Sequence, residues 1–555
     1  MGTTTIDPRR TRAVDPVHDD RTTGPATGTG TLVRLMLRRD RIKLPAWVGG
    51  LGLFMVYLGA ALPQLAPTEA DLAAVTPMVQ QPVGRLFTGP AYGMEDPTHA
   101  SFFAAGYLLY LLLLAALMNI MLVTRHTRLE EQSGRSELVR ADVVGRQAPL
   151  TAALVVAVVT NVAAAVVVGA LALANGWPGS GTAVVAAAVG LVGLAFAGIT
   201  AVAAQLSAHS RGAAGLAGLV LGAAFALRAL GDMVATGGSS LSWTSPLGWA
   251  AQAAPYVLDR WEPLLLLLAL AAGTILLAYA LQGRRDFGAG LLPARRGHER
   301  GGASLGTPWG LALRLQRGPW LAWGAAAVFL GVIDGAFTQV MLDSADALPP
   351  EMQAMFGAEQ MTLGYVAFLS VFSAMLTSAY VVYAVQSLRA EEAAGRAELV
   401  LATPTSRAAW AGAHLAVVAL GATVIMLVTG VLTGVAATTV TGDASLTWDS
   451  TAAHLNLVPA VLAVLGLVAL LHGWVPVLLA PVGWAMVGLV VFSGTFAALL
   501  DVPQAVVDLS PLSHPAQVPV ETVELTPLLV LLGLAVLGVG LGLVGLRRRQ
   551  VAGRS

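Results

Sequence analysis

The sequence predicts an all-α integral membrane protein with about twelve transmembrane helices. Hydrophobic residues make up 56% of its 555 residues and charged residues only 12%, against about 25% charged residues in ordinary soluble proteins. The mean hydropathy is +0.72. The apolar residues form runs of about 20, the length that an α-helix needs to cross a bilayer. None of these runs alternates between apolar and polar residues as a β-barrel strand does.

Twelve runs are long enough to span a membrane, six in each half of the chain. The predicted spans are 44–65, 102–124, 149–173, 183–206, 212–234, 262–282, 319–341, 363–386, 409–437, 457–480, 482–500 and 526–546. Residues 457–500 are almost continuously apolar. We place the break in them at Pro481, because proline tends to end or kink a helix.

The basic residues predict the orientation of these spans, because Lys and Arg gather in cytoplasmic loops. With both termini inside, 29 of the 32 Lys and Arg residues fall in cytoplasmic segments. The alternate loops are then nearly bare of them. We therefore expect a multi-pass protein of the cell membrane with both termini in the cytoplasm.

Composition also excludes several classes of site. The net charge of zero excludes an overall basic nucleic-acid binder, and the absence of cysteine excludes disulfides, iron–sulfur clusters and thiolate zinc sites. The single lysine, Lys43, is followed by Leu44, so the chain lacks the GxxxxGK[ST] loop that holds nucleotide phosphates. Residues 1–30 are rich in Thr, Pro, Gly, Asp and Arg, which predicts a disordered cytoplasmic tail and no signal peptide.

A charged loop occurs twice in the chain. Residues 128–146 and 389–407 align without a gap and are identical at ten of nineteen positions. Shared hydrophobicity cannot explain a match of charged residues and a glycine. The shared positions singled out as candidate site residues are Glu130, Glu131, Gly134, Arg135, Glu137 and Leu138 in the first copy and Glu391, Glu392, Gly395, Arg396, Glu398 and Leu399 in the second.

Two further echoes extend this repeat. Residues 37–47 resemble 313–323, and Ser-Pro-Leu at 245–247 returns at 510–512. The chain is therefore predicted to be two six-span halves of the same orientation, related by a pseudo-twofold axis along the membrane normal with a pathway between them. The predicted parts are a tail 1–30, a first half 31–282, a cytoplasmic linker 283–308, a second half 309–546 and a tail 547–555.

Each repeated loop has the chemistry of a docking element. As a short helix it would pair Glu131 with Arg135, and Glu392 with Arg396, at the favourable i,i+4 spacing. The glycine offers a bare backbone and the Leu-Val dipeptide after it an apolar knob, which together suit a groove on a partner. The competing interpretation is a solvated loop whose charges only set the topology.

The repeated loop and the span pattern resemble the permeases of ABC-2-type exporters. In that family the loop between the second and third spans is a coupling helix seated in the ATPase subunit, and both copies of the loop stand at that position. Residues 31–43 and 309–318 are similar to the family's amphipathic connecting helix, and 235–261 and 501–525 to its re-entrant or external helical hairpin. The fused twelve-span form most resembles actinobacterial polyketide-antibiotic exporters of the tetronasin-resistance type.

Ionisable residues inside spans are candidates for a transport pathway, because they are costly in hydrocarbon. Arg228 and Asp232 lie four residues apart on the fifth span and would neutralise each other. Asp334 on the seventh span has no partner in its own helix, and we expect it to meet Arg228 or a wet cavity. A pair between Arg228 and Asp334 would form an outer gate.

Other polar residues in the spans carry plainer predictions. We expect His472 to be a hydrogen-bonded interior histidine, and Asn119 and Asn161 to join helices. We expect close helix packing at the glycines of the fifth span, which are Gly212, Gly215, Gly218 and Gly222. His126, Glu130 and Glu131 lack a further ligand at metal spacing, so we predict no metal site.

The sequence and its resemblance together predict a transport permease without catalytic residues of its own. The resemblance implies export of hydrophobic or amphipathic compounds, driven by ATP and Mg²⁺ on two copies of a separate ATPase subunit. The chain itself would hold no cofactor. The alternatives are a secondary transporter driven by an ion gradient, and a membrane-embedded enzyme or structural assembly protein. The small number of ionisable residues within the spans disfavours the transporter, and the absence of clustered catalytic motifs disfavours the enzyme.

Overall fold

The structure is a computed structural model that describes residues 24–134, 144–292, 301–343, 361–496 and 503–549. Contacts divide the chain into two compact units. Unit 1 comprises residues 1–61, 103–231 and 237–294, and unit 2 comprises residues 62–102, 232–236 and 295–555. Each unit is described by itself. Within the described ranges every regular element is a helix.

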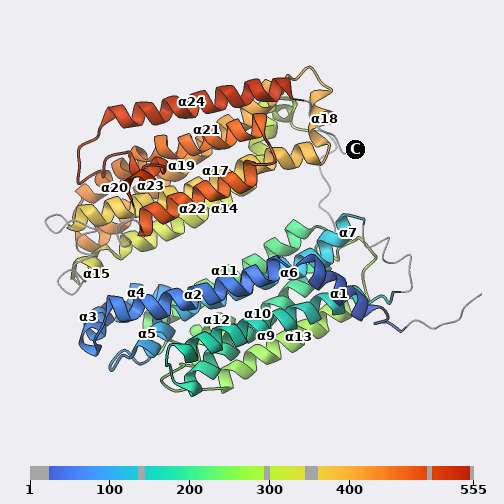
Figure 1. Cartoon of the computed structure of the whole chain (residues 1–555), viewed down its shortest axis with the longest axis vertical. Coiled ribbons are helices and arrows are strands. Elements are labelled where there is room, and N and C mark those ends of the chain that lie inside the picture. The colour runs from blue at the N-terminus through green and yellow to red at the C-terminus, as the bar shows by residue number, and fades with distance from the viewer. Residues whose placement is uncertain (1–23, 135–143, 293–300, 344–360, 497–502, 550–555) are drawn as a thin grey trace, which may run out of the picture. The chain divides into compact units, whose positions relative to one another are not determined.

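The helices follow the chain in two groups (Figure 1). The first half contains α1 (Thr29–Arg39), α2 (Lys43–Leu65), α3 (Glu69–Gln80), α4 (Pro82–Thr88), α5 (His99–Gly106), α6 (Leu108–Thr124), η1 (Arg125–Leu129), α7 (Glu130–Gln132), α9 (Ala148–Ala174), α10 (Gly179–Leu206), α11 (Ser210–Val234), η2 (Ser242–Thr244), α12 (Pro246–Gln252) and α13 (Glu262–Gln282). The second half contains η3 (Ala303–Gly306), α14 (Pro308–Ala336), α15 (Thr338–Asp343), α17 (Met361–Ala393), α18 (Arg396–Leu401), α19 (Arg407–Thr441), α20 (Ser445–Asn456), α21 (Val458–Trp474), α22 (Leu479–Phe496), α23 (Gln504–Val507), η5 (Pro511–Ser513) and α24 (Leu525–Arg548).

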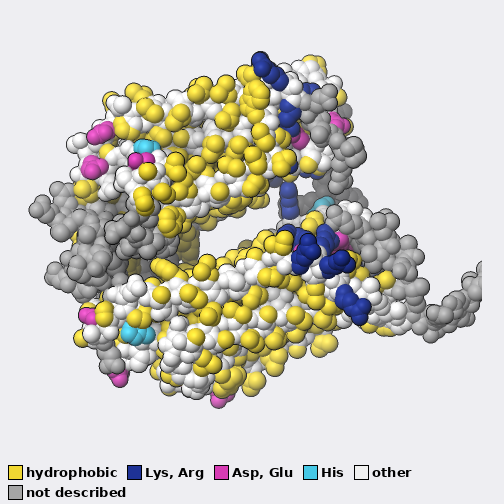
Figure 2. All heavy atoms as spheres, in the orientation of Figure 1, with side chains coloured by type: hydrophobic (Ala, Val, Ile, Leu, Met, Phe, Trp, Pro, Cys, Tyr) yellow, Lys and Arg dark blue, Asp and Glu magenta, His cyan; other side chains and the backbone are white. Residues whose placement is uncertain are grey.

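The predicted all-α membrane fold of about twelve spans is confirmed. Eleven described helices are long and apolar enough to cross a membrane, and a shorter apolar helix covers Leu479–Gly494. Hydrophobic side chains cover the long sides of each unit, while Lys and Arg gather towards the end that carries α1 in unit 1 and α18 in unit 2 (Figure 2). This distribution suits helices surrounded by lipid and charged loops in water.

The break predicted at Pro481 is wrong by several residues. Helix α21 ends at Trp474 and α22 begins at Leu479, so Pro481 lies in the first turn of α22, where a missing N–H costs nothing. The break lies at residues 475–478 instead and contains Pro476. A proline disfavours helical geometry in the residue before it, and Val475 accordingly has φ −136° and ψ 69°.

The two predicted connecting helices differ from each other. Helix α1 is separate from α2, and it buries Leu32 and Met36 against α6 and α9 while Leu35 is 53% exposed. Residues 309–318 are helical as well, but they form one continuous helix, α14, with the span that follows. The second connecting segment is therefore helical but runs into its span without a break.

Unit 1 is held together by apolar packing and a buried amide pair. The side chains of Asn119 on α6 and Asn161 on α9 exchange two hydrogen bonds of 2.9 Å and are fully buried. Gly193 on α10 leaves the space for this pair, because an added Cβ there would lie 2.0 Å from Oδ1 of Asn161. The prediction that the two asparagines join helices is confirmed.

In unit 2, α21 and α24 lie side by side (Figure 1) and approach closely through glycines. A Cβ on Gly473 would lie 2.0 Å from the carbonyl oxygen of Gly542, and one on Gly538 would lie 2.5 Å from that of Gly466. Small residues at such contacts let helix backbones approach within the membrane. The glycines predicted for this role on α11 make no such contact within the described residues: no atom lies within 4 Å of an added Cβ on Gly215, Gly218 or Gly222, and one on Gly212 would meet only the side chain of Ser207, just before the helix.

The two Ser-Pro-Leu repeats each begin a short helix. Ser245 is the N-cap of α12 and accepts hydrogen bonds from the backbone N–H groups of Leu247 and Gly248. Its hydroxyl also donates to the carbonyl oxygen of Ala224 on α11, 2.6 Å away. Ser510 precedes η5 and is equally buried. The segments before the last spans are thus helical in part, as the resemblance implied.

Candidate functional site

Each repeated loop follows a long helix and contains a short one. In the first copy α6 passes through the π-helical turn η1 into α7. In the second copy α17 continues to Ala393, and α18 precedes α19. Three predicted site residues of the first copy lie outside the described residues, namely Arg135, Glu137 and Leu138. Their counterparts Arg396, Glu398 and Leu399 are all on α18.

Gly134 and Gly395 adopt the same backbone conformation. Each has φ +72°, in the left-handed region, and donates its N–H to the carbonyl oxygen three residues earlier. No atom lies within 4 Å of an added Cβ at either position. The glycine is therefore required by the turn itself, since other residues are strained at positive φ. The sequence had suggested only that a partner approaches there.

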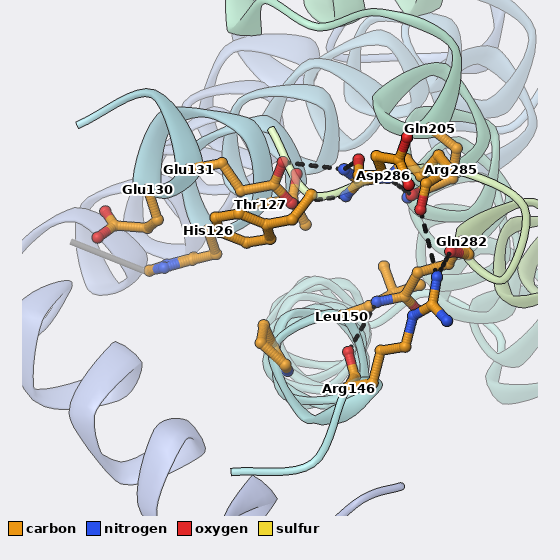
Figure 3. Close-up of a pocket in the computed structure, with 12 residues that line it drawn as sticks. His126, Thr127, Glu130, Glu131, Arg146, Leu150, Gln205, Gln282, Arg285 and Asp286 are labelled. Atoms are coloured by element: carbon orange, nitrogen blue, oxygen red, sulfur yellow. Dashed lines mark hydrogen bonds and ion pairs between the residues drawn. The ribbon is translucent and has the colours of Figure 1, made fainter. Parts of the chain in front are cut away.

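Glu131 is engaged within unit 1 by two arginines. Its carboxylate accepts from Arg128, 2.8 Å away, and from Nη2 of Arg285 at 2.5 Å (Figure 3). Arg285 follows the last span of this half, α13, and its Nε also donates to Gln205 on α10. The side chains of Glu131 and Arg285 are only 14% and 7% exposed.

Glu392 is engaged in the corresponding way within unit 2. Nη2 of Arg549, at the end of the last span α24, donates to both carboxylate oxygens at 2.7 and 2.9 Å. Nε2 of His472 lies 3.3 Å from the same carboxylate. The predicted pairing of Glu392 with Arg396 is wrong: Arg396 forms two bonds of 2.7 Å with Glu391, which raise its pKa.

A second repeated residue ties each loop to the same last span. Arg146 donates to the carbonyl oxygens of Gln282, Gly283 and Arg285 at 3.1–3.2 Å. Its counterpart Arg407 donates to the carbonyl oxygen of Arg549 at 2.6 Å. A cation at a helix C-terminus satisfies unpaired carbonyl groups and the helix dipole. Both arginines therefore cap the end of the sixth span of their own half.

In the first half a polar hollow lies beside these contacts. A cavity of about 310 Å³ lies between the loop and the end of α13 (Figure 3). Its lining includes His126, Glu131, Arg146 and Arg285. The charged groups at this end of unit 1 thus border a polar space and not hydrocarbon.

The outer side of α18 has the opposite character. Ala397 packs on Trp410 and Leu546, whereas Leu399 is 75% exposed and Glu398 is exposed beside it. The inner and outer positions of the motif therefore have different surroundings, which the sequence pattern did not distinguish.

The loops also contact the segment before the first span of their half. In unit 1 Asp40 accepts from His126 at 2.7 Å and pairs with Arg125 at 2.9 Å. In unit 2 the aligned residues are Gln316 and Ser387, and Nε2 of Gln316 donates to the hydroxyl of Ser387 at 2.8 Å. The same junction is ionic in one half and neutral in the other.

The predicted gate residues lie on two helices, Arg228 and Asp232 on α11 and Asp334 on α14. Arg228 is fully buried, with its guanidinium 5.1 Å from the centre of the Phe225 ring. Asp232 is also fully buried, and Arg85 on α4 donates to its carbonyl oxygen at 2.7 Å. Asp334 is half-buried on α14. A meeting of Arg228 with Asp334 stays a prediction.

The sequence did not indicate the partners of Glu131 and Glu392. From the sequence, Arg285 and Arg549 contribute only to the positive charge of the cytoplasmic segments. The available signal was that arginines stand directly after the sixth span in both halves, at 284–285 and at 547–549. The residue that closes each copy of the loop was noted as a match, but nothing in its spacing pointed to a helix end far along the chain.

Comparison with known proteins gives one family. The family described as multidrug efflux system permease Rv1217c, C-terminal domain, matches residues 30–281 and 305–547. The multidrug efflux system permease protein Rv1217c of Mycobacterium tuberculosis is 35% identical over 532 residues, which cover 95% of each chain.

Proposed function

The chain belongs to the family of the multidrug efflux system permease Rv1217c, and on that premise we propose that it is the permease of an ABC exporter. It moves hydrophobic or amphipathic drugs out of the cell, and a separate subunit hydrolyses the ATP with Mg²⁺. The narrower substrate class is that of polyketide antibiotics. The single lysine of the chain, Lys43, is not part of a GxxxxGK[ST] phosphate-binding loop, which supports a nucleotide site on another chain.

One observation carries this proposal: the second copy of the repeated loop contains an anchored helix with an exposed face. On α18 the exposed Leu399 stands beside Glu398, while Ala397 fixes the helix to its unit. A large apolar anchor with charged neighbours suits the centre of a protein–protein interface. We assign the ATPase to this face and to its counterpart on the first loop.

The test is to replace the exposed anchor. In Leu399→Asp a carboxylate occupies the centre of the interface, and loss of a central anchor costs about 2 kcal/mol, or roughly thirtyfold in affinity. We expect the variant to reach the membrane normally and to lose co-purification of the ATPase and drug-stimulated ATP hydrolysis. Leu509→Asp, at a similarly exposed leucine between α23 and η5, is the matched control.

Two outcomes contradict the proposal. One is full ATPase binding by Leu399→Asp at the wild-type level. The other is drug efflux by the purified chain in vesicles that contain an ion gradient but no ATPase, which would establish a secondary transporter.

A further inference from the structure

The second glutamate of each loop makes the same long-range ion pair in both halves. Glu131 pairs with Arg285 and Glu392 pairs with Arg549, at sequence separations of 154 and 157 residues. Each arginine stands directly after the sixth span of the half that contains the glutamate. The two glutamates are aligned in the repeat, and each forms its ion pair within its own unit. The ion pair is therefore a repeated feature of the two halves and not a chance contact on one surface.

The closing arginine of each loop strengthens this connection. Arg146 and Arg407 bind the carbonyl groups at the ends of α13 and α24, beside Arg285 and Arg549. Each loop therefore binds the end of its sixth span through an ion pair and a helix cap. We call these four contacts the loop–span clamps: Glu131–Arg285 with Arg146 in unit 1, and Glu392–Arg549 with Arg407 in unit 2.

The ion pairs of the clamps are shielded from water. Their charged side chains are largely withdrawn from water, with exposures of 14% and 7% in unit 1 and 6% and 17% in unit 2. Charge-assisted hydrogen bonds between such groups are shorter and stronger than neutral ones, and salt screens them little. Arg549 binds both oxygens of Glu392, which also fixes the orientation of the pair.

The clamps also complete a three-way junction. Each loop is joined covalently to the second and third spans of its half, which are α6 and α9 in unit 1 and α17 and α19 in unit 2. Among the described residues, the sixth span meets the same loop through side-chain contacts, of which the clamp is the ionic part. A displacement of the loop would therefore move two spans directly, and the clamp would carry it to the third.

We infer that Glu131, Arg285, Glu392 and Arg549 are positioning residues that transmit movement of the repeated loops to the sixth spans, α13 and α24. This role rests on the proposed function, because it requires a partner that moves the loops. It goes beyond that function in separating the residues that receive the partner from those that carry its motion inward. The exposed face of α18 does the first, and the clamps do the second.

The experiment reverses the clamp of unit 2 and then restores it. Glu392→Lys and Arg549→Glu are made singly and together, in the full chain co-expressed with its ATPase. Arg548→Glu is the matched control, because Arg548 is the adjacent exposed arginine of the same helix end. Four quantities are measured for each: protein in the membrane, bound ATPase, basal ATP hydrolysis and drug efflux.

We expect each single variant to keep its ATPase and basal hydrolysis while drug efflux falls about tenfold, within the range typical of coupled sites. The double variant should recover most of the efflux, because the opposite charges again meet. A residue that only stabilised the fold would lower membrane protein and efflux together. Should Arg549→Glu not reach the membrane, Arg549→Lys keeps the charge without the two-pronged geometry, and we expect bound ATPase with reduced efflux.

Wild-type efflux in the single variants, or in Arg549→Lys, overturns the clamp, as does a double variant no better than either single one. Loss of the ATPase from the single variants also overturns it, because the glutamate would then belong to the docking face. Absence of the ATPase from the wild-type complex overturns the proposed function itself, and the role of the clamp with it.

Discussion

The reciprocal amide pair of Asn119 and Asn161 shows how single residues fix the helix contacts of unit 1. Each side chain also donates to the carbonyl oxygen four residues before it on its own helix. The two amides therefore satisfy one another where water is absent. Gly193 belongs to the same arrangement, because any side chain there would displace the pair.

Removal of one amide should destabilise the unit measurably. In Asn161→Ala the amide of Asn119 loses its partner, and hydrogen bonds between membrane helices are worth about 0.6 to 1.7 kcal/mol. We expect a lower thermal unfolding temperature in detergent. Asn175→Ala, at an exposed asparagine that ends the same helix, should be close to wild type. Equal losses in the two variants would show that the buried pair does not stabilise the unit.

The sequence predicted the residues of the loops better than their partners. The repeat identified Glu131 and Glu392 because the two copies could be compared directly. It then assigned them to neighbours four residues away, because helical spacing describes contacts within one helix only. For Glu392 the observed partner is Arg549, 157 residues away, and no spacing rule reaches that far.

At the scale of the helix, the glycines of α21 and α24 decide how closely two spans pack. The same composition on α11 led to a wrong expectation, since Gly215, Gly218 and Gly222 meet no atom within 4 Å. A row of glycines permits close approach but does not say which helix lies opposite. That information comes from tertiary packing, which the sequence of one span does not contain.

A side chain at the α21–α24 contact should separate the two helices. In Gly473→Val the added atoms would meet the backbone of Gly542, and overpacking of this kind costs about 1–3 kcal/mol. We expect less protein in the membrane and a lower unfolding temperature. Gly540→Val, on the same pair of helices but with no atom within 4 Å of its Cβ, is the control. Similar behaviour of both variants would contradict a role for this contact.

The limits of the helices were predictable only where the chain marks them. The break after α21 contains Pro476, but the sequence has a second proline nearby, Pro481. Proline disfavours the interior of a helix and helical geometry in the residue before it, and this rule alone does not say which of the two prolines marks the break. The separation of α1 from α2 depends on Asp40, whose carboxylate is held by His126 and Arg125. The aligned Gln316 lies within the unbroken α14. A charge interaction with another helix thus accompanies the break in one half only.

At the scale of the whole molecule, two repeated loops in one chain predict the composition of the complex. Because each loop would receive one ATPase, a single permease chain should bind two. The mass of the purified, drug-active particle checks this directly. A particle of two permease chains with two ATPases would contradict this prediction. The fold of the permease chain does not by itself give the number of chains in the complex.

The span pattern was the most predictable property of the chain. Hydrophobic runs report the cost of placing residues in lipid, a property that each segment carries by itself. In the part of the chain that the structure describes, the twelve runs therefore correspond to eleven long helices and one shorter one. The ion pairs between distant segments depend on how those helices pack, and only the structure placed them.

Each loop–span clamp closes within one unit of the chain, since residues 131, 146 and 285 all lie in unit 1, before residue 295, and residues 392, 407 and 549 all lie in unit 2, after it. A gene cut just after residue 294 would thus encode two polypeptides that each retain a complete clamp. Fusion and fission would be nearly equivalent events in the history of such a transporter, because the peptide bond between its halves carries none of the clamp's mechanical load.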